Sequence, residues 1–125
     1  MKVMKMDKVP RELITDPDFK PGKAYRQVFS DDPGRNLDVF TVHFSKGCRN
    51  PWHIHSSDQV FIVTAGKGII ANEEKEYIVE PGDLIIVPGG EKHWQGATKD
   101  SEFSHFYVLQ HGCETTVFSN KTYKL

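Results

Sequence analysis

The sequence is poor in cysteine and has no long apolar run. Cys48 and Cys113 are its only cysteines in 125 residues, and they form no Cys-x-x-Cys pair. They indicate neither a disulfide framework nor a zinc site, so we expect two free thiols. No apolar run approaches the roughly 20 residues that span a bilayer, and residues 1–6 lack the apolar core of a secretory signal. We therefore expect a cytoplasmic protein with no membrane partner.

The sequence also lacks a charge excess of either sign. Its 16 Lys and Arg face 17 Asp and Glu, which gives a formal net charge of -1. No overall field attracts the chain to a phosphate backbone, so we expect no nucleic-acid partner. The length suits one domain that can bury a core without disulfides or a structural metal. A metal in this chain would therefore be functional.

Runs long enough for amphipathic helices are missing, because turn signals such as Pro81-Gly82-Asp83 and Pro88-Gly89-Gly90 recur at short intervals. Between them stand short runs rich in β-branched and aromatic residues. We predict strands at 24–29, 37–44, 60–64, 68–71, 77–79, 84–87, 103–109 and 115–118. This pattern predicts an all-β sandwich or barrel over residues 21–125. Residues 1–20 are predicted to form an arm that either crosses onto a neighbouring subunit or frays.

Two strand patterns predict what covers the sheet faces. Residues 40–44 alternate cleanly, which places His43 on the face away from the core. Residues 61–63 and 84–87 are apolar without alternation, as in strands that are covered on both faces. A second subunit could provide the outer cover, so these runs predict a homodimer.

Three histidines and a glutamine are candidate metal ligands. His53 and His55 stand two residues apart, so in a strand both point to one face and can bind one metal as neutral imidazoles. Gln59 could return beside them through a hairpin. His93, which follows a predicted buried strand and a turn, supplies a third imidazole by position.

These residues resemble the two signatures of the cupin superfamily. The matching positions are Gly47, His53, His55, Gln59 and Gly66 in the first signature and Gly82, Pro88, Gly90 and His93 in the second. The usual Glu is Gln59, and the common final Asn is Ala97. The resemblance implies a single-domain jelly-roll β-barrel with a divalent metal bound by His53, His55, His93 and the residue at position 59. The alternative is a metal-free barrel, because some cupins lack metal.

Glutamine at position 59 changes the charge of the predicted site. Its carbonyl oxygen can bind a metal but carries no charge, so the site would be one unit more positive than with Glu. A more positive metal is a stronger Lewis acid and reaches its trivalent state less easily. The donor set suits several ions: we favour Mn or Fe, with Zn, Ni and Co as alternatives.

Local sequence around the histidines is similar to small cupins related to the carboxymuconolactone decarboxylase group and to manganese-dependent hydroxynitrile lyases. Three-His, one-Gln relatives of that kind would hold a cyanohydrin oxygen or cyanide on the metal while a base moves the hydroxyl proton. His105, in the predicted strand 103–109, is our candidate base; the alternative is a histidine in the barrel wall. Those lyases often carry a further His where this sequence has Gln95.

The predicted substrate pocket is lined by residues of the barrel strands. The candidates are Phe40, Val42, Phe61, Trp94 and Gln95, although apolar residues in a barrel are more often core. The leading hypothesis is a metalloenzyme that acts on a small molecule by lyase-type chemistry. A metal-dependent dioxygenase and a non-catalytic binding or sensor protein are the alternatives.

Overall fold

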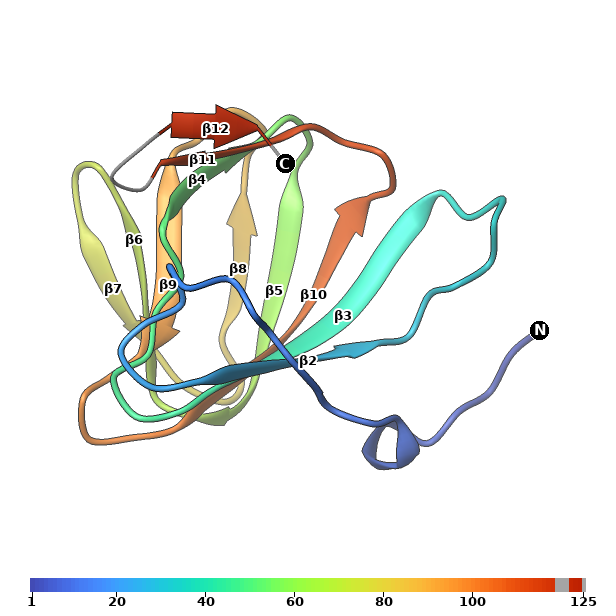
Figure 1. The fold of residues 1–125 in the computed structure, drawn as a ribbon, viewed down its shortest axis with the longest axis horizontal. Helices are drawn as coiled ribbons and strands as arrows, with labels where there is room; N and C mark the ends of the chain where they lie inside the picture. Colours follow the sequence, from blue (N-terminus) through green and yellow to red (C-terminus); the bar gives the residue numbers. More distant parts are fainter. Residues whose placement is uncertain (119–121, 125) are drawn as a thin grey trace.

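Two six-stranded antiparallel sheets face one another in a computed structural model of the chain, which describes residues 1–118 and 122–124 (Figure 1). The first sheet has the order β1-β2-β3-β10-β5-β8, with β1 at Glu12–Leu13, β2 at Ala24–Val28, β3 at Leu37–Phe44, β10 at Phe103–Gln110, β5 at Gln59–Gly66 and β8 at Leu84–Val87. The second sheet has the order β12-β11-β4-β9-β6-β7, with β12 at Thr122–Lys124, β11 at Thr115–Phe118, β4 at Trp52–His55, β9 at His93–Ala97, β6 at Gly68–Asn72 and β7 at Glu76–Val79. This jelly-roll sandwich confirms the predicted all-β, single-domain fold.

Helical structure in the described residues is limited to one turn of 3-10 helix at Met6–Lys8. Among these residues no helix has the length and apolar character needed to cross a membrane. The predicted strands agree with the observed ones to within about two residues, and the predicted domain end at residue 125 lies outside the described part of the chain. Local alternation and turn residues thus predict most of the secondary structure.

The core lies between the two sheets and is rich in phenylalanine. Phe44, Phe61 and Phe103 are at most 2% exposed, and the rings of Phe44 and Phe103 stack with centroids 6.0 Å apart. These residues face inward because side chains alternate along a strand: in β5, Gln59, Phe61 and Val63 are buried while Ile62 points out. The same alternation places the site residues on the inner face.

A glycine closes the corner between β5 and β6, where the chain passes from one sheet to the other. Gly66 has φ +74°, a conformation that L side chains rarely adopt. A Cβ at this position would also overlap the Glu102 carbonyl group. The corner, and with it the placement of β6 against β9, therefore requires glycine.

The second half of the predicted arm folds against its own sandwich. Strand β1 pairs with β2, and the side chains of Ile14 and Phe19 pack against the core cluster. Phe19 stacks on Phe44 with ring centroids 6.2 Å apart. Nearer the N-terminus, the carbonyl oxygens of Met6 and Val9 accept hydrogen bonds from the side-chain amide of Gln27, at 2.9 and 2.8 Å. Burial of two apolar side chains at the mouth of the sandwich explains this docking.

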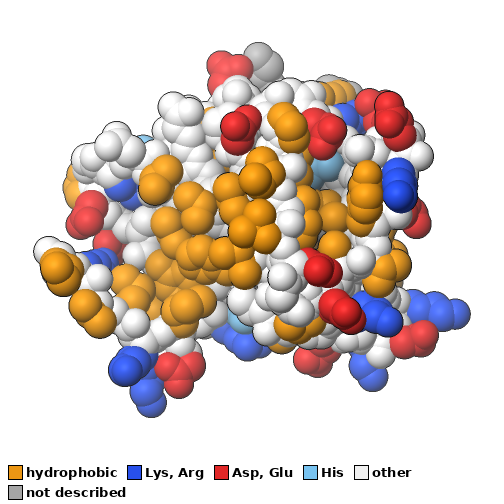
Figure 2. All heavy atoms as spheres, turned by 180° about the vertical axis from the view of Figure 1, so that it is seen from behind, with side chains coloured by type: hydrophobic (Ala, Val, Ile, Leu, Met, Phe, Trp, Pro, Cys, Tyr) orange, Lys and Arg blue, Asp and Glu red, His pale blue; other side chains and the backbone are white. Residues whose placement is uncertain are grey.

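The outer face of β5 and β8 is apolar and uncovered in the single chain. Ile62, Leu84 and Ile86 are 39%, 59% and 62% exposed. From the continuous apolar runs in β5 and β8, we expect strands that are covered on both faces. In the single chain only the inner face of these strands is covered. Figure 2 shows that hydrophobic side chains gather over the middle of the molecule when it is viewed from behind.

Candidate metal centre

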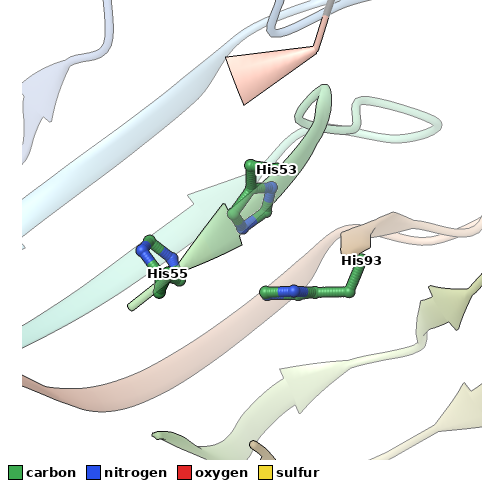
Figure 3. Close-up of side chains that lie close together, drawn as sticks. All are labelled: His53, His55 and His93. Atoms are coloured by element: carbon green, nitrogen blue, oxygen red, sulfur yellow. The ribbon is translucent and has the colours of Figure 1, made fainter. Parts of the chain in front are cut away.

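Three imidazoles converge from two neighbouring strands of the second sheet. His53 in β4 pairs directly with His93 in β9, and His55 follows two residues later on the same face as His53. The ring centroids of His53 and His93 lie 4.2 Å apart, and those of His53 and His55 lie 5.0 Å apart. Figure 3 shows the three rings clustered together. One nitrogen from each lies within 4.8 Å of the others, so small side-chain movements would let all three bind one ion at about 2.1 Å.

Hydrogen bonds at Nδ1 orient each ring. His53 Nδ1 lies 2.8 Å from the Pro51 carbonyl oxygen, and His93 Nδ1 lies 2.9 Å from that of Glu91. A carbonyl only accepts, so these contacts place the proton on Nδ1 and leave the lone pair on Nε2. His55 Nδ1 lies 2.8 Å from the Thr115 hydroxyl, which supports the same arrangement.

The histidines are neutral at pH 7. Burial, followed by the neighbouring imidazoles His93 and His55, holds the pKa of His53 well below its usual value. Burial lowers the pKa of His55 to about 4 and also lowers that of His93. Neutral imidazole is the form that binds a metal, so no proton has to be displaced at pH 7.

Gln59 reaches the cluster from the opposite sheet. It begins β5, is 2% exposed, and its Oε1 lies 3.3 Å from His93 Nε2. The predicted hairpin is wrong, because β5 pairs with β10 and β8 while the histidine strands belong to the other sheet. With the proton on Nδ1, His93 presents a lone pair to the Gln59 oxygen. Two acceptors then face one another, and they need either a cation between them or a rotated Gln59 amide that presents its nitrogen to His93. The first arrangement shows that this donor set fits a metal ion.

A cavity of about 410 Å³ opens beside His53, His55 and Gln59. Two residues of the predicted pocket, Val42 and Gln95, line it. Its remaining lining residues come from the N-terminal segment and from strands of both sheets: Ile14, Thr15, Asp16, Phe19, Arg26, Phe44, Asn50, Pro51, Tyr107, Leu109, Thr115 and Val117. The volume is in the range of small-molecule sites.

Three of the predicted pocket residues do not line this cavity. Trp94 is on the other face of β9, with the Arg49 guanidinium 3.6 Å from its ring, because the alternation that turns His93 and Gln95 inward turns Trp94 outward. Phe61 faces inward but lies behind the cluster, edge-on to His93 at a centroid distance of 6.3 Å. Phe40 packs against Tyr107, with ring centroids 5.1 Å apart.

His105 faces inward but is shielded from the cavity. It is 1% exposed, and burial lowers its pKa to about 3. Its Nε2 lies 3.5 Å from the side-chain nitrogen of Gln95, which does line the cavity. His105 Nδ1 and Gln95 Oε1 are both buried without a hydrogen-bond partner among the described residues. Gln95 therefore stands between His105 and the cavity.

Several cavity residues, including Arg26 and Tyr107, are not among the candidates predicted from the sequence. For Arg26 a signal existed, because alternation along β2 places it on the same face as buried Ala24. Burial raises the pKa of the Tyr107 hydroxyl well above its usual value, against the opposing effect of nearby Arg26. Thr115, which orients His55 from a strand sixty residues away, had no signal in the sequence.

Comparison with known proteins gives one family. The family model described as a cupin domain matches residues 40–109, more than half of the chain. A cupin-like protein from Thermotoga maritima superposes with a TM-score of 0.77 at 31% identity, covering 85% of this chain and 82% of that one. The polyketide cyclase RemF from Streptomyces resistomycificus superposes with a TM-score of 0.79 at 19% identity, covering 95% and 87%, which shows the fold alone.

Two curated relatives are enzymes of different classes. The chain is 38% identical over 71 residues to an (R)-mandelonitrile lyase from Granulicella tundricola, covering 56% of this chain and 54% of the relative. It is 36% identical over 77 residues to an acireductone dioxygenase from Bacillus mycoides, covering 58% and 42%. The chain thus spans about half the length of the curated relatives it matches.

Proposed function

This chain belongs to the cupin family, and from that premise we propose that it is a divalent-metal enzyme that acts on a small organic molecule by lyase-type chemistry. The observation that carries the proposal is the donor set of three neutral imidazoles with an uncharged amide, which lies beside a cavity of small-molecule size. The similarity to a mandelonitrile lyase supports the same class.

His53, His55, His93 and Gln59 would hold the metal. When bound, it would supply a Lewis acid for a substrate oxygen or a leaving anion. Because all four donors are neutral, the site keeps the full charge of the ion, which favours polarisation over oxidation of the metal. We propose manganese or iron as the native ion, with zinc, nickel or cobalt as alternatives.

His105 is the proposed base, and Gln95 controls access to it. The side chain of Gln95 both lines the cavity and contacts His105, so its rotation would expose His105 Nε2 to a substrate. In cleavage of a cyanohydrin, the hydroxyl proton would go to the base while the carbon–carbon bond to the nitrile breaks and releases aldehyde and cyanide. His105→Phe should then abolish turnover without reducing metal content. Full turnover in this variant would remove His105 from the reaction.

Elemental analysis tests the premise of the proposal. We expect about one metal per chain in protein purified without chelators, and none in a His53→Ala/His93→Ala double variant. His111→Ala is the matched control, because this exposed histidine lies outside the cluster and should leave the metal content unchanged. Metal content that is equal in all three proteins would contradict the site.

The activity is tested with the metal-loaded protein and racemic mandelonitrile. Metal-dependent release of benzaldehyde and cyanide, lost in the double variant, would assign cyanohydrin cleavage to the site. No release above the rate with the double variant, across several aromatic and aliphatic cyanohydrins, would contradict cyanohydrin cleavage.

A dioxygenase is the second candidate, and the similarity to acireductone dioxygenases favours it. Substrate-dependent oxygen consumption by the iron-loaded protein, measured with an oxygen electrode, would establish this class. A Gln59→Glu variant sharpens the comparison, because the added negative charge should make oxidation of the metal easier. A rise of oxygen uptake only in the variant would assign lyase-type chemistry to the natural site.

We also propose that the chain forms a homodimer through the outer face of β5 and β8. Ile62, Leu84 and Ile86 expose apolar side chains there, and a second copy would bury them. Ile86→Lys should convert a dimer to a monomer in sedimentation equilibrium, whereas Leu13→Lys, at a residue 50% exposed on β1, should not. A monomeric wild-type protein would contradict this assembly.

A further inference from the structure

One wall of the cavity carries a cation with no ionic partner. Arg26 extends from β2 on its inner face, as its pairing with the cavity residue Val42 and the burial of Ala24 show. Its guanidinium carbon lies 5.7 Å from the centre of the Phe40 ring, and its side chain donates a hydrogen bond to the Tyr107 hydroxyl oxygen. Because a guanidinium carries five N–H donors, donors remain for a ligand. No carboxylate among the described residues lies within 4.0 Å of it.

Among the described residues, only one other charged side chain lines the cavity. Asp16 enters from the N-terminal segment, and its Oδ1 accepts the backbone N–H of Asp18 at 2.9 Å. The charges of Asp16 and Arg26 offset one another, and imidazoles bind a metal in their neutral form. A divalent ion on neutral donors would leave the cavity net positive, so the field inside favours an anionic ligand.

The remaining walls of the cavity indicate the chemistry of the uncharged part of an anionic ligand. Val42, Leu109 and Val117 provide apolar surface between the two sheets. The cavity volume of about 410 Å³ admits a small organic molecule and excludes a polymer. A ligand that fits has a charged end, an apolar body and an oxygen that can reach the histidine cluster.

We infer that the substrate or product of this site is a small carboxylic acid whose carboxylate pairs with Arg26 while a hydroxyl or carbonyl oxygen faces the three histidines. The planar guanidinium suits two parallel N–H bonds to a carboxylate, a geometry that an ammonium group lacks. Arg26 is thereby the residue that sets specificity for acids over neutral analogues. The inference rests on the proposed metal site, because it places the reacting oxygen at the histidine cluster, and it makes an acid, in place of a neutral cyanohydrin, the expected substrate of that site.

Calorimetric titration of the metal-loaded protein with mandelate and with its neutral analogue mandelamide tests this assignment. Arg26→Gln should weaken mandelate binding at least tenfold and leave mandelamide binding within twofold. Arg26→Lys should retain part of the preference. The wild-type preference should also shrink as ionic strength rises. Lys23→Gln is the matched control, because this exposed cation precedes β2 outside the cavity and should change neither affinity.

Three results would overturn the inference: no preference for mandelate in wild type, mandelate affinity unchanged in Arg26→Gln, or equal weakening of both ligands. Equal melting temperatures of wild type and Arg26→Gln exclude a folding defect as the cause of a lost preference. Failure of the proposed function appears separately, as absence of metal in elemental analysis. The same titrations on the His53→Ala/His93→Ala variant then measure the contribution of Arg26 without the metal.

Discussion

Replacing His105 with phenylalanine should remove part of the acid sensitivity of the fold. His105 is 1% exposed among the rings of Phe44, Phe61, Phe103 and Tyr107, and burial lowers its pKa from 6.5 to about 3. Between these two values the unfolded chain binds a proton at this histidine and the folded chain does not. Stability conferred by the neutral ring is therefore complete above pH 6.5 and decreases as the pH falls.

The size of the effect follows from the two pKa values. Each pH unit in which only the unfolded chain holds the proton lowers the free energy of unfolding by about 1.4 kcal/mol. From the unfolded pKa of 6.5 down to pH 5 is one and a half units, which gives about 2 kcal/mol. The wild type should thus lose about 2 kcal/mol more than His105→Phe between pH 8 and pH 5.

Urea unfolding at several pH values with a chelator present measures this difference. The chelator keeps the metal site empty in both proteins, so release of metal does not contribute to the difference. A second variant, His105→Leu, guards against overpacking by phenylalanine, since only the change with pH enters the argument and absolute stabilities can differ. Parallel profiles of wild type and both variants would refute a buried neutral histidine at this position.

Three further substitutions test the fold, two by thermal or urea unfolding and the third by limited proteolysis. Gly66→Ala should destabilise the protein strongly, because its φ of +74° and the nearby Glu102 carbonyl both exclude a Cβ. A decrease in the free energy of unfolding of less than about 1 kcal/mol would contradict the requirement for glycine at this corner. Phe61→Ala should cost about 3–5 kcal/mol, because a fully buried ring leaves a cavity, whereas Leu37→Ala at a residue 52% exposed should have little effect. Gln27→Ala should free residues 6–9 for proteolysis, because it removes two hydrogen bonds; unchanged cleavage would contradict their role.

The sequence by itself determined the strands and part of the site. Turn residues and period-two alternation are local properties, so they fixed the strands and put His53 and His55 on one face before any pairing was known. The same rule applied to β9 places Trp94 on the opposite face of the strand from His93 and Gln95, where Arg49 lies against its ring. The match to two family signatures supplied His93 and Gln59, which local patterns alone could not connect.

Only the tertiary structure decided how distant segments meet at the cavity. Gln59 approaches His93 across the sandwich, and Thr115 orients His55 from a third strand. Arg26 lines the same cavity as His53 because β2 pairs with β3, while Gln95 shields His105 because β9 and β10 lie in opposite sheets. These contacts depend on which strands pair and in what register. Pairing and register follow from burial summed over the whole chain, so no local pattern encodes them.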